Sequence, residues 1–72
     1  MRSFDDTHGS SWQTAVLDAS YGNMLLVFSH TGDGGVRKTT MSAENLRLAE
    51  QQLADMDVSQ LRLLLAESVP WD

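Results

Sequence analysis

The sequence predicts an α+β domain in which a three-stranded antiparallel β-meander is followed by two short α-helices packed on one face. Two observations predict this class. The chain first shows three runs rich in apolar and β-branched residues, separated by glycine-containing turn signals. From Ser42 onward it shows two amphipathic segments, with apolar residues at the spacing of one helix face.

The expected strands are Trp12–Ala19, Met24–His30 and Val36–Met41. The pair Gly22–Asn23 between the first two runs is typical of a tight hairpin turn. Thr31–Gly35 is a second, glycine-rich turn. Both faces of the second run are apolar near its middle, so we expect this run to be the central strand.

Each expected helix follows a residue type that commonly starts one. Ser42 and Asp57 are expected as N-caps, because their side chains can accept a hydrogen bond from an otherwise unpaired backbone N–H. Pro70 is expected to end the second helix. The expected buried stripes are Leu46, Ala49, Leu53 and Met56 in the first helix and Val58, Leu61, Leu64 and Leu65 in the second.

Length and composition bound the organisation of the chain. Residues 1–10 mix small and polar types without a period, so we expect a loose N-terminal arm there and a single small α+β domain over residues 11–72. The chain has 72 residues and no cysteine, so neither a disulfide nor a thiolate metal site can reinforce its small core.

The negative charge is concentrated in the helical part of the chain. The whole chain carries a formal charge of −5, of which residues 42–72 contribute −4, from six acidic and two basic residues. Such a surface repels nucleic acid and anionic membranes and attracts basic protein segments. The start of the chain lacks the apolar stretch of a signal peptide, and the longest apolar run is too short to span a bilayer. We therefore expect a cytoplasmic protein with no nucleic-acid or membrane partner.

No group of residues points to catalysis, a cofactor or a metal. His8 and His30 are the only histidines, and they lack the spacing of zinc ligands. Ser29, His30 and Asp33 have the residue types of a hydrolytic triad, but triad members converge from separate segments. The glycine-rich turn connects two strands, whereas a phosphate-binding loop leads from a strand into a helix. We expect a protein that is not an enzyme.

Each expected helix carries one leucine opposite its buried stripe. Leu48 and Leu63 lie on these outward faces, with carboxylates nearby, which favours a contact surface for a basic, partly apolar partner. Trp71 follows the helix-ending proline and either caps the core or is exposed. The expected partner-binding residues are Glu44, Leu48, Asp55, Leu63, Glu67 and Trp71.

In length and overall character the chain resembles the small regulators that bacteriophages make to take over host machinery, in particular the small inhibitors of host RNA polymerase from Xanthomonas phages. The segments that carry this resemblance are Trp12–Phe28, with its tight turn, and Met41–Leu65. The resemblance implies binding to a host RNA polymerase subunit, inhibition of transcription initiation and possible antitermination.

The first hypothesis is therefore an acidic, non-enzymatic protein-binding regulator of host transcription. The second is a DNA mimic that inhibits a nuclease or restriction enzyme, although ten carboxylates in 72 residues form a sparse array for a mimic. The third is a small self-assembling structural protein, with the outward leucines forming a homodimer interface.

Overall fold

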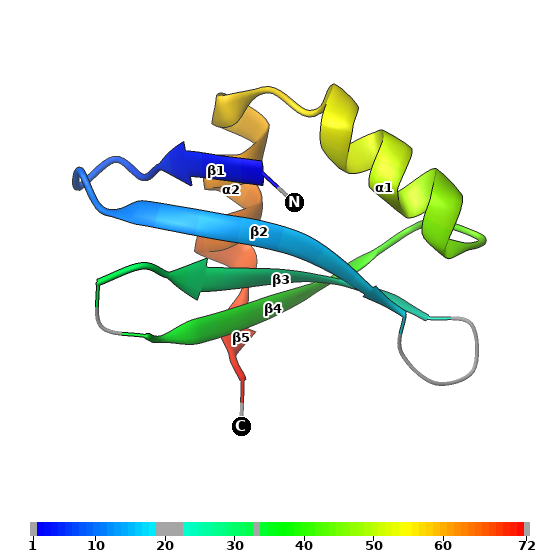
Figure 1. Ribbon diagram of the computed structural model, residues 1–72, viewed down its shortest axis with the longest axis horizontal. Coiled ribbons are helices and arrows are strands. Elements are labelled where there is room, and N and C mark those ends of the chain that lie inside the picture. Colours follow the sequence, from blue (N-terminus) through cyan, green and yellow to red (C-terminus); the bar gives the residue numbers. More distant parts are fainter. Residues whose placement is uncertain (1, 19–22, 33, 72) are drawn as a thin grey trace.

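The computed structural model describes residues 2–18, 23–32 and 34–71. In chain order the elements are β1 (Arg2–Asp5), β2 (Ser11–Asp18), β3 (Met24–His30), β4 (Val36–Met41), α1 (Leu46–Asp55), α2 (Val58–Glu67) and β5 (Val69–Pro70). The strands form one antiparallel sheet in the order β1-β2-β3-β4-β5, and α2 passes behind the strands in Figure 1. The α+β class therefore stands.

The predicted three-stranded meander is wrong, because the sheet has five strands. The first additional strand lies in the segment expected as a loose arm. Arg2–Asp5 pairs with β2, with Phe4 opposite Trp12. Phe4 is buried in the core and holds this strand to the sheet. The prediction failed because one buried aromatic residue in a short polar segment gives no periodic signal.

The second additional strand is the two-residue β5, which pairs with β4 after the helices. The sequence interpretation gave Pro70 only the role of ending α2. In the structure Pro70 lies opposite Arg37, at the edge of the sheet where proline is tolerated. The chain therefore returns to the sheet after both helices and closes the fold against β4.

The three central strands follow the predicted pattern closely. β3 is the central strand and pairs with β2 on one side and β4 on the other. Leu26 and Phe28 lie on one face of β3 and are fully buried, whereas Leu25 and Val27 lie on the other and are partly exposed. Part of the predicted hairpin turn, including Gly22, lies outside the described residues.

Both helices pack on the face that carries Leu26 and Phe28. α1 contributes Leu53 and α2 contributes Leu61 to one core cluster with these two residues and Phe4. The core is therefore built between one face of the sheet and a single layer of helices (Figure 1).

The predicted N-cap of α2 is confirmed, and the predicted N-cap of α1 is wrong. Asp57 caps α2 by accepting a hydrogen bond from the backbone N–H of Gln60. The N-cap of α1 is Asn45, whose side chain accepts from the Leu48 N–H, so the predicted cap at Ser42 is wrong by three residues. Leu46 and Val58, which were expected in the buried stripes, are 39% and 38% exposed because each is the first residue of its helix.

Arg2 and Arg62 each join segments that are far apart in the chain. The Arg2 guanidinium donates to the carbonyl oxygens of Leu53 and Met56 at the end of α1. Arg62 Nε donates to the Asp5 carbonyl oxygen at 2.8 Å, which ties α2 to β1.

Within the described residues, neither helix is long and apolar enough to cross a membrane.

Candidate protein-interaction surfaces

Two surfaces of the molecule expose large apolar side chains. We call the first the helix layer: the solvent-facing side of α1 and α2 and the segment before α1, with Glu44, Leu48, Glu50, Asp55, Leu63 and Glu67. We call the second the open sheet face: the side of the sheet that neither helix covers, with Asp5, Ala15, Leu17, Leu25, Val27, Val36, Lys38, Val69 and Trp71.

The two outward leucines of the helix layer are exposed, as their position in the sequence predicted. Leu63 is 61% exposed, and Leu48 is 40% exposed. Leu48 lies in a shallow hollow with Glu44, which is itself exposed, and Gln52. A partner side chain that covers Leu48 therefore meets a carboxylate at the same place.

Leu63 lies in a different hollow, so the structure does not bring the two leucines into one site. α1 packs mainly on β2, whereas α2 packs on β4 and β1, which separates their outward faces. The hollow beside Leu63 is lined by Arg37 and Arg62 as well as by Asp6. Leu63 therefore offers apolar surface beside mixed charge, not the acidic surroundings that the sequence suggested.

The remaining predicted site residues divide between the two surfaces. Asp55 is exposed in a third hollow with Gln60, and Glu67 is exposed at the last position of α2. Trp71 lies on the other side of the molecule, on the open sheet face. The predicted composite site is thus split into an acidic region around α1, an apolar contact on α2 and an aromatic contact on the sheet.

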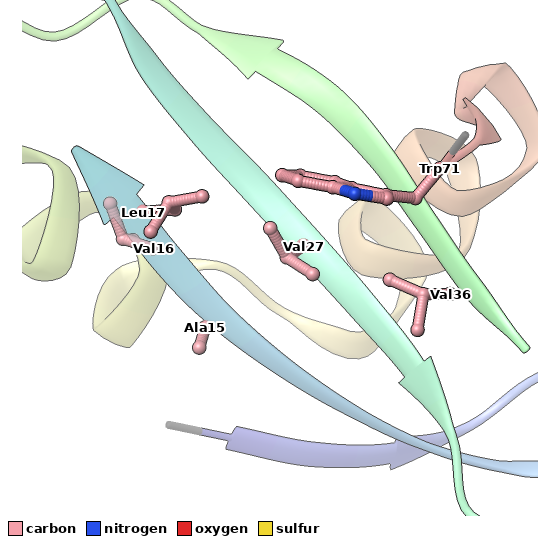
Figure 2. A pocket seen from close by; sticks show the side chains of 6 residues that line it. All are labelled: Ala15, Val16, Leu17, Val27, Val36 and Trp71. Carbon is pink, nitrogen blue, oxygen red and sulfur yellow. The ribbon is translucent and has the colours of Figure 1, made fainter. Parts of the chain in front are cut away.

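The open sheet face arises from the alternation of side chains along the strands. Since Leu26 and Phe28 point into the core, Leu25 and Val27 point to the opposite side. A shallow cavity of about 390 Å³ lies on this side, and Figure 2 shows the side chains that line it. It is lined by Ala15, Val16, Leu17, Val27, Val36 and Trp71.

Trp71 is positioned by the return of the chain to β4. Its backbone N–H donates to the Val36 carbonyl oxygen at 2.9 Å, which extends the pairing of β5 with β4. Its side chain crosses β4 toward β3 (Figure 2). Lys38 Nζ lies 5.0 Å from the ring centroid. Trp71 is 43% exposed, so it packs against the sheet on the side opposite the core and presents the rest of its ring to solvent.

The sequence interpretation missed the open sheet face as a site. The two-sided apolar character of Met24–His30 was its signal, but that pattern also fits a strand buried on both sides. Which side the helices cover depends on long-range packing, above all on Leu53 and Leu61 meeting Phe28. The other apolar side of the sheet can therefore be identified as an exposed surface only when this packing is known.

The structure describes some of the residues that were considered for chemistry. Within the described residues no group of three or more His, Asp or Glu side chains is placed to hold a metal ion. His30 meets the Trp12 ring edge-on at 4.8 Å, and its Nδ1 accepts from the Gly32 N–H. Asp33, the third member of the triad-like set, lies outside the described residues.

No protein-family model matches the chain, and neither a curated protein nor a solved structure matches it significantly.

Proposed function

We propose that this chain is a non-enzymatic regulator that acts by binding another protein through its helix layer. The observation that supports this best is the exposure of Leu63, which at 61% is the most exposed large apolar residue among those described. Leu48 adds a second apolar contact on α1. Covering either leucine with a partner is worth roughly 1–2 kcal/mol from the apolar area removed from water.

The charges on α1 and on the segment before it indicate which kind of partner this surface would bind. Glu44 is exposed beside Leu48, and Glu50 and Asp55 are exposed elsewhere on α1, so this region attracts a basic segment that carries an apolar anchor. An amphipathic helix with lysines has these properties. Because the carboxylates are solvent-exposed, added salt screens the attraction and weakens binding.

The partner in this proposal is a subunit of bacterial RNA polymerase, and the protein works in the cytoplasm of the host cell. Two observations support this more specific form. One is the resemblance to the small phage inhibitors of host RNA polymerase. The other is the acidic helix layer, which fits basic protein surfaces. In this role the chain inhibits or redirects transcription at initiation, with antitermination as a related outcome.

The test is binding of the purified chain to purified bacterial RNA polymerase at low and high salt. We expect binding at low salt that falls steeply as salt is raised. Leu63→Ala should weaken binding roughly ten-fold if Leu63 is a central contact. Leu17→Ala is the matched control, because it removes the same side-chain atoms from the opposite side of the molecule.

Two results would count against the proposal. If Leu48→Ala, Leu63→Ala and Glu67→Lys all leave binding unchanged, the helix layer is not the contact surface. If the polymerase does not bind at any salt concentration, the partner is wrong, and a pulldown from bacterial lysate under the same two salt conditions then shows whether another basic protein is retained.

A further inference from the structure

We propose that the open sheet face binds a second copy of this chain, giving a homodimer in which two sheets pack face to face and the two helix layers point outward. This proposal does not depend on the proposed function, because it uses the opposite side of the molecule. It differs from the homodimer considered from the sequence, in which the outward leucines formed the interface.

The first argument is the apolar character of a surface that the fold leaves uncovered. Leu17, Val69 and Trp71 are 44%, 54% and 43% exposed, and they lie on the same side of the sheet as the partly exposed Val27 and Val36. An antiparallel sheet that faces water usually alternates apolar and polar residues. This sheet is apolar on both sides at its centre, so its second side can pack on another sheet about 10 Å away, as the inner faces of a sandwich do.

The second argument is that the face can complement itself. It carries a hollow of about 390 Å³ that is lined by Ala15, Val27 and the Trp71 ring, and this ring is 43% exposed (Figure 2). In a dimer with two-fold symmetry, each copy offers the same patch to the other. The exposed side of the Trp71 ring of one copy can therefore pack against the apolar residues of the other, and the reverse contact forms at the same time.

The third argument is size. The molecule is thin, with Cα extents of 33 × 27 × 18 Å, and the sheet spreads across its broad side (Figure 1). The two longer extents bound a rectangle of roughly 900 Å² around the whole molecule, which is an upper limit for its sheet side and is close to the ~800 Å² that each partner contributes to a standard stable interface. An interface of standard size on this side therefore uses most of the open sheet face.

The fourth argument is charge, which favours a second copy over an acidic or a basic partner. The charged groups of the open sheet face among the described residues are Lys38 and Asp5, whose charges sum to zero. The excess negative charge lies in the helical part of the chain, from residue 42 onward. Packing the neutral faces together keeps the two acidic layers apart, whereas packing helix layers together would bring like charges into contact.

The experiment is sedimentation equilibrium of the full chain from about 1 µM to about 1 mM, the range in which a dissociation constant of moderate strength is measurable. We expect the mass to rise with concentration from 8.0 kDa toward twice that value. Because the face is neutral, the dissociation constant should change little with salt, whereas binding through the helix layer should weaken.

Variants on the two sides separate this dimer from other associations. Leu17→Glu places a charge on the rim of the interface, and Trp71→Ala removes its partly exposed ring. Each should raise the dissociation constant roughly ten-fold or more. Leu63→Ala is the control on the helix layer and should leave it unchanged. Circular dichroism checks that each variant is folded. If Trp71→Ala does not fold, Leu17→Glu alone tests the interface, because Leu17 is at the exposed margin of the face.

Three outcomes would overturn the proposal. A mass of 8.0 kDa at every concentration shows that the open sheet face does not bind a second copy. A dimer that is unaffected by both sheet-face variants uses another surface. A dimer that is lost with Leu63→Ala uses the helix layer, as in the leucine-mediated homodimer considered from the sequence. None of these outcomes bears on whether the chain binds RNA polymerase.

Discussion

The ring of Phe4 meets the ring of Phe28 edge-on, with centroids 5.9 Å apart and an interplanar angle of 75°. This contact joins the first strand of the chain to the central strand across β2, which lies between them. Edge-to-face aromatic pairs contribute about 0.5–1.5 kcal/mol beyond the area they bury. Phe4 is therefore the residue that makes β1 part of the domain.

Replacing Phe4 with Ala should lower the free energy of unfolding by about 3 kcal/mol, because a buried ring is removed and a cavity remains. Urea denaturation followed by circular dichroism measures the change. Ser3→Ala is the matched control: it alters the neighbouring, exposed position of the same strand and should change stability by less than about 0.5 kcal/mol. A small effect of Phe4→Ala would show that β1 adds little to the fold.

The outcome at β1 shows where sequence reasoning was limited. The β2, β3 and β4 strands each carry several apolar or β-branched residues, and the predicted ranges match the observed ones closely. β1 and β5 have no such pattern, because each depends on one partner strand and a few contacts made after the rest of the sheet exists. Edge strands of this kind are defined by tertiary structure.

The sequence predicted the candidate sites less completely than it predicted the three central strands. A helical period was enough to place Leu48 and Leu63 on the outer surface, and both are exposed. It was not enough to show that they line separate hollows, because that depends on how each helix crosses the sheet. The position of Trp71 on the open sheet face followed from β5, which the sequence did not indicate.

The start of α1 offers a direct comparison between a predicted and an observed N-cap. Asn45→Ala should cost about 1 kcal/mol, because the Leu48 N–H loses the side-chain acceptor that Asn45 provides. Ser42→Ala should cost much less, since the Gln52 side chain bonds to the backbone carbonyl of Ser42 and not to its hydroxyl. Thermal denaturation of both variants checks this order. Equal losses would mean that the helix begins nearer Ser42 in solution.

Thr14 is buried, and its Oγ1 has no hydrogen-bond partner among the described residues. A buried hydroxyl without a partner costs stability, because it has lost its bonds to water. Thr14→Val keeps nearly the same shape and removes this group, so we expect the free energy of unfolding to rise by about 1 kcal/mol. Denaturant titration at neutral pH measures the gain. A loss of stability would show that the hydroxyl is bonded in solution, for instance to a water molecule.

The turn between β1 and β2 is organised around the Asp6 carboxylate. Trp12 Nε1 donates to Asp6 Oδ2 at 2.9 Å, and the backbone N–H groups of His8 and Ser10 donate to Oδ1. The Trp12 hydrogen bond, followed by that of Ser10, holds the pKa of Asp6 below its ordinary value of 3.8. The folded state thus favours the ionised form of Asp6 more than the unfolded chain does.

The sign of the resulting pH dependence follows from that lowered pKa. The stabilisation from Asp6 is fully present above the pKa of the unfolded chain, near 3.8, and is lost as the pH falls through the lower folded pKa. Trp12→Phe removes the main donor and keeps an aromatic ring, so the pKa of Asp6 should rise toward its ordinary value. Titration of the Asp6 side-chain carboxyl by NMR measures this directly. If its pKa is the same in both proteins, the Trp12 hydrogen bond does not stabilise the carboxylate, and the turn is held by the backbone donors alone.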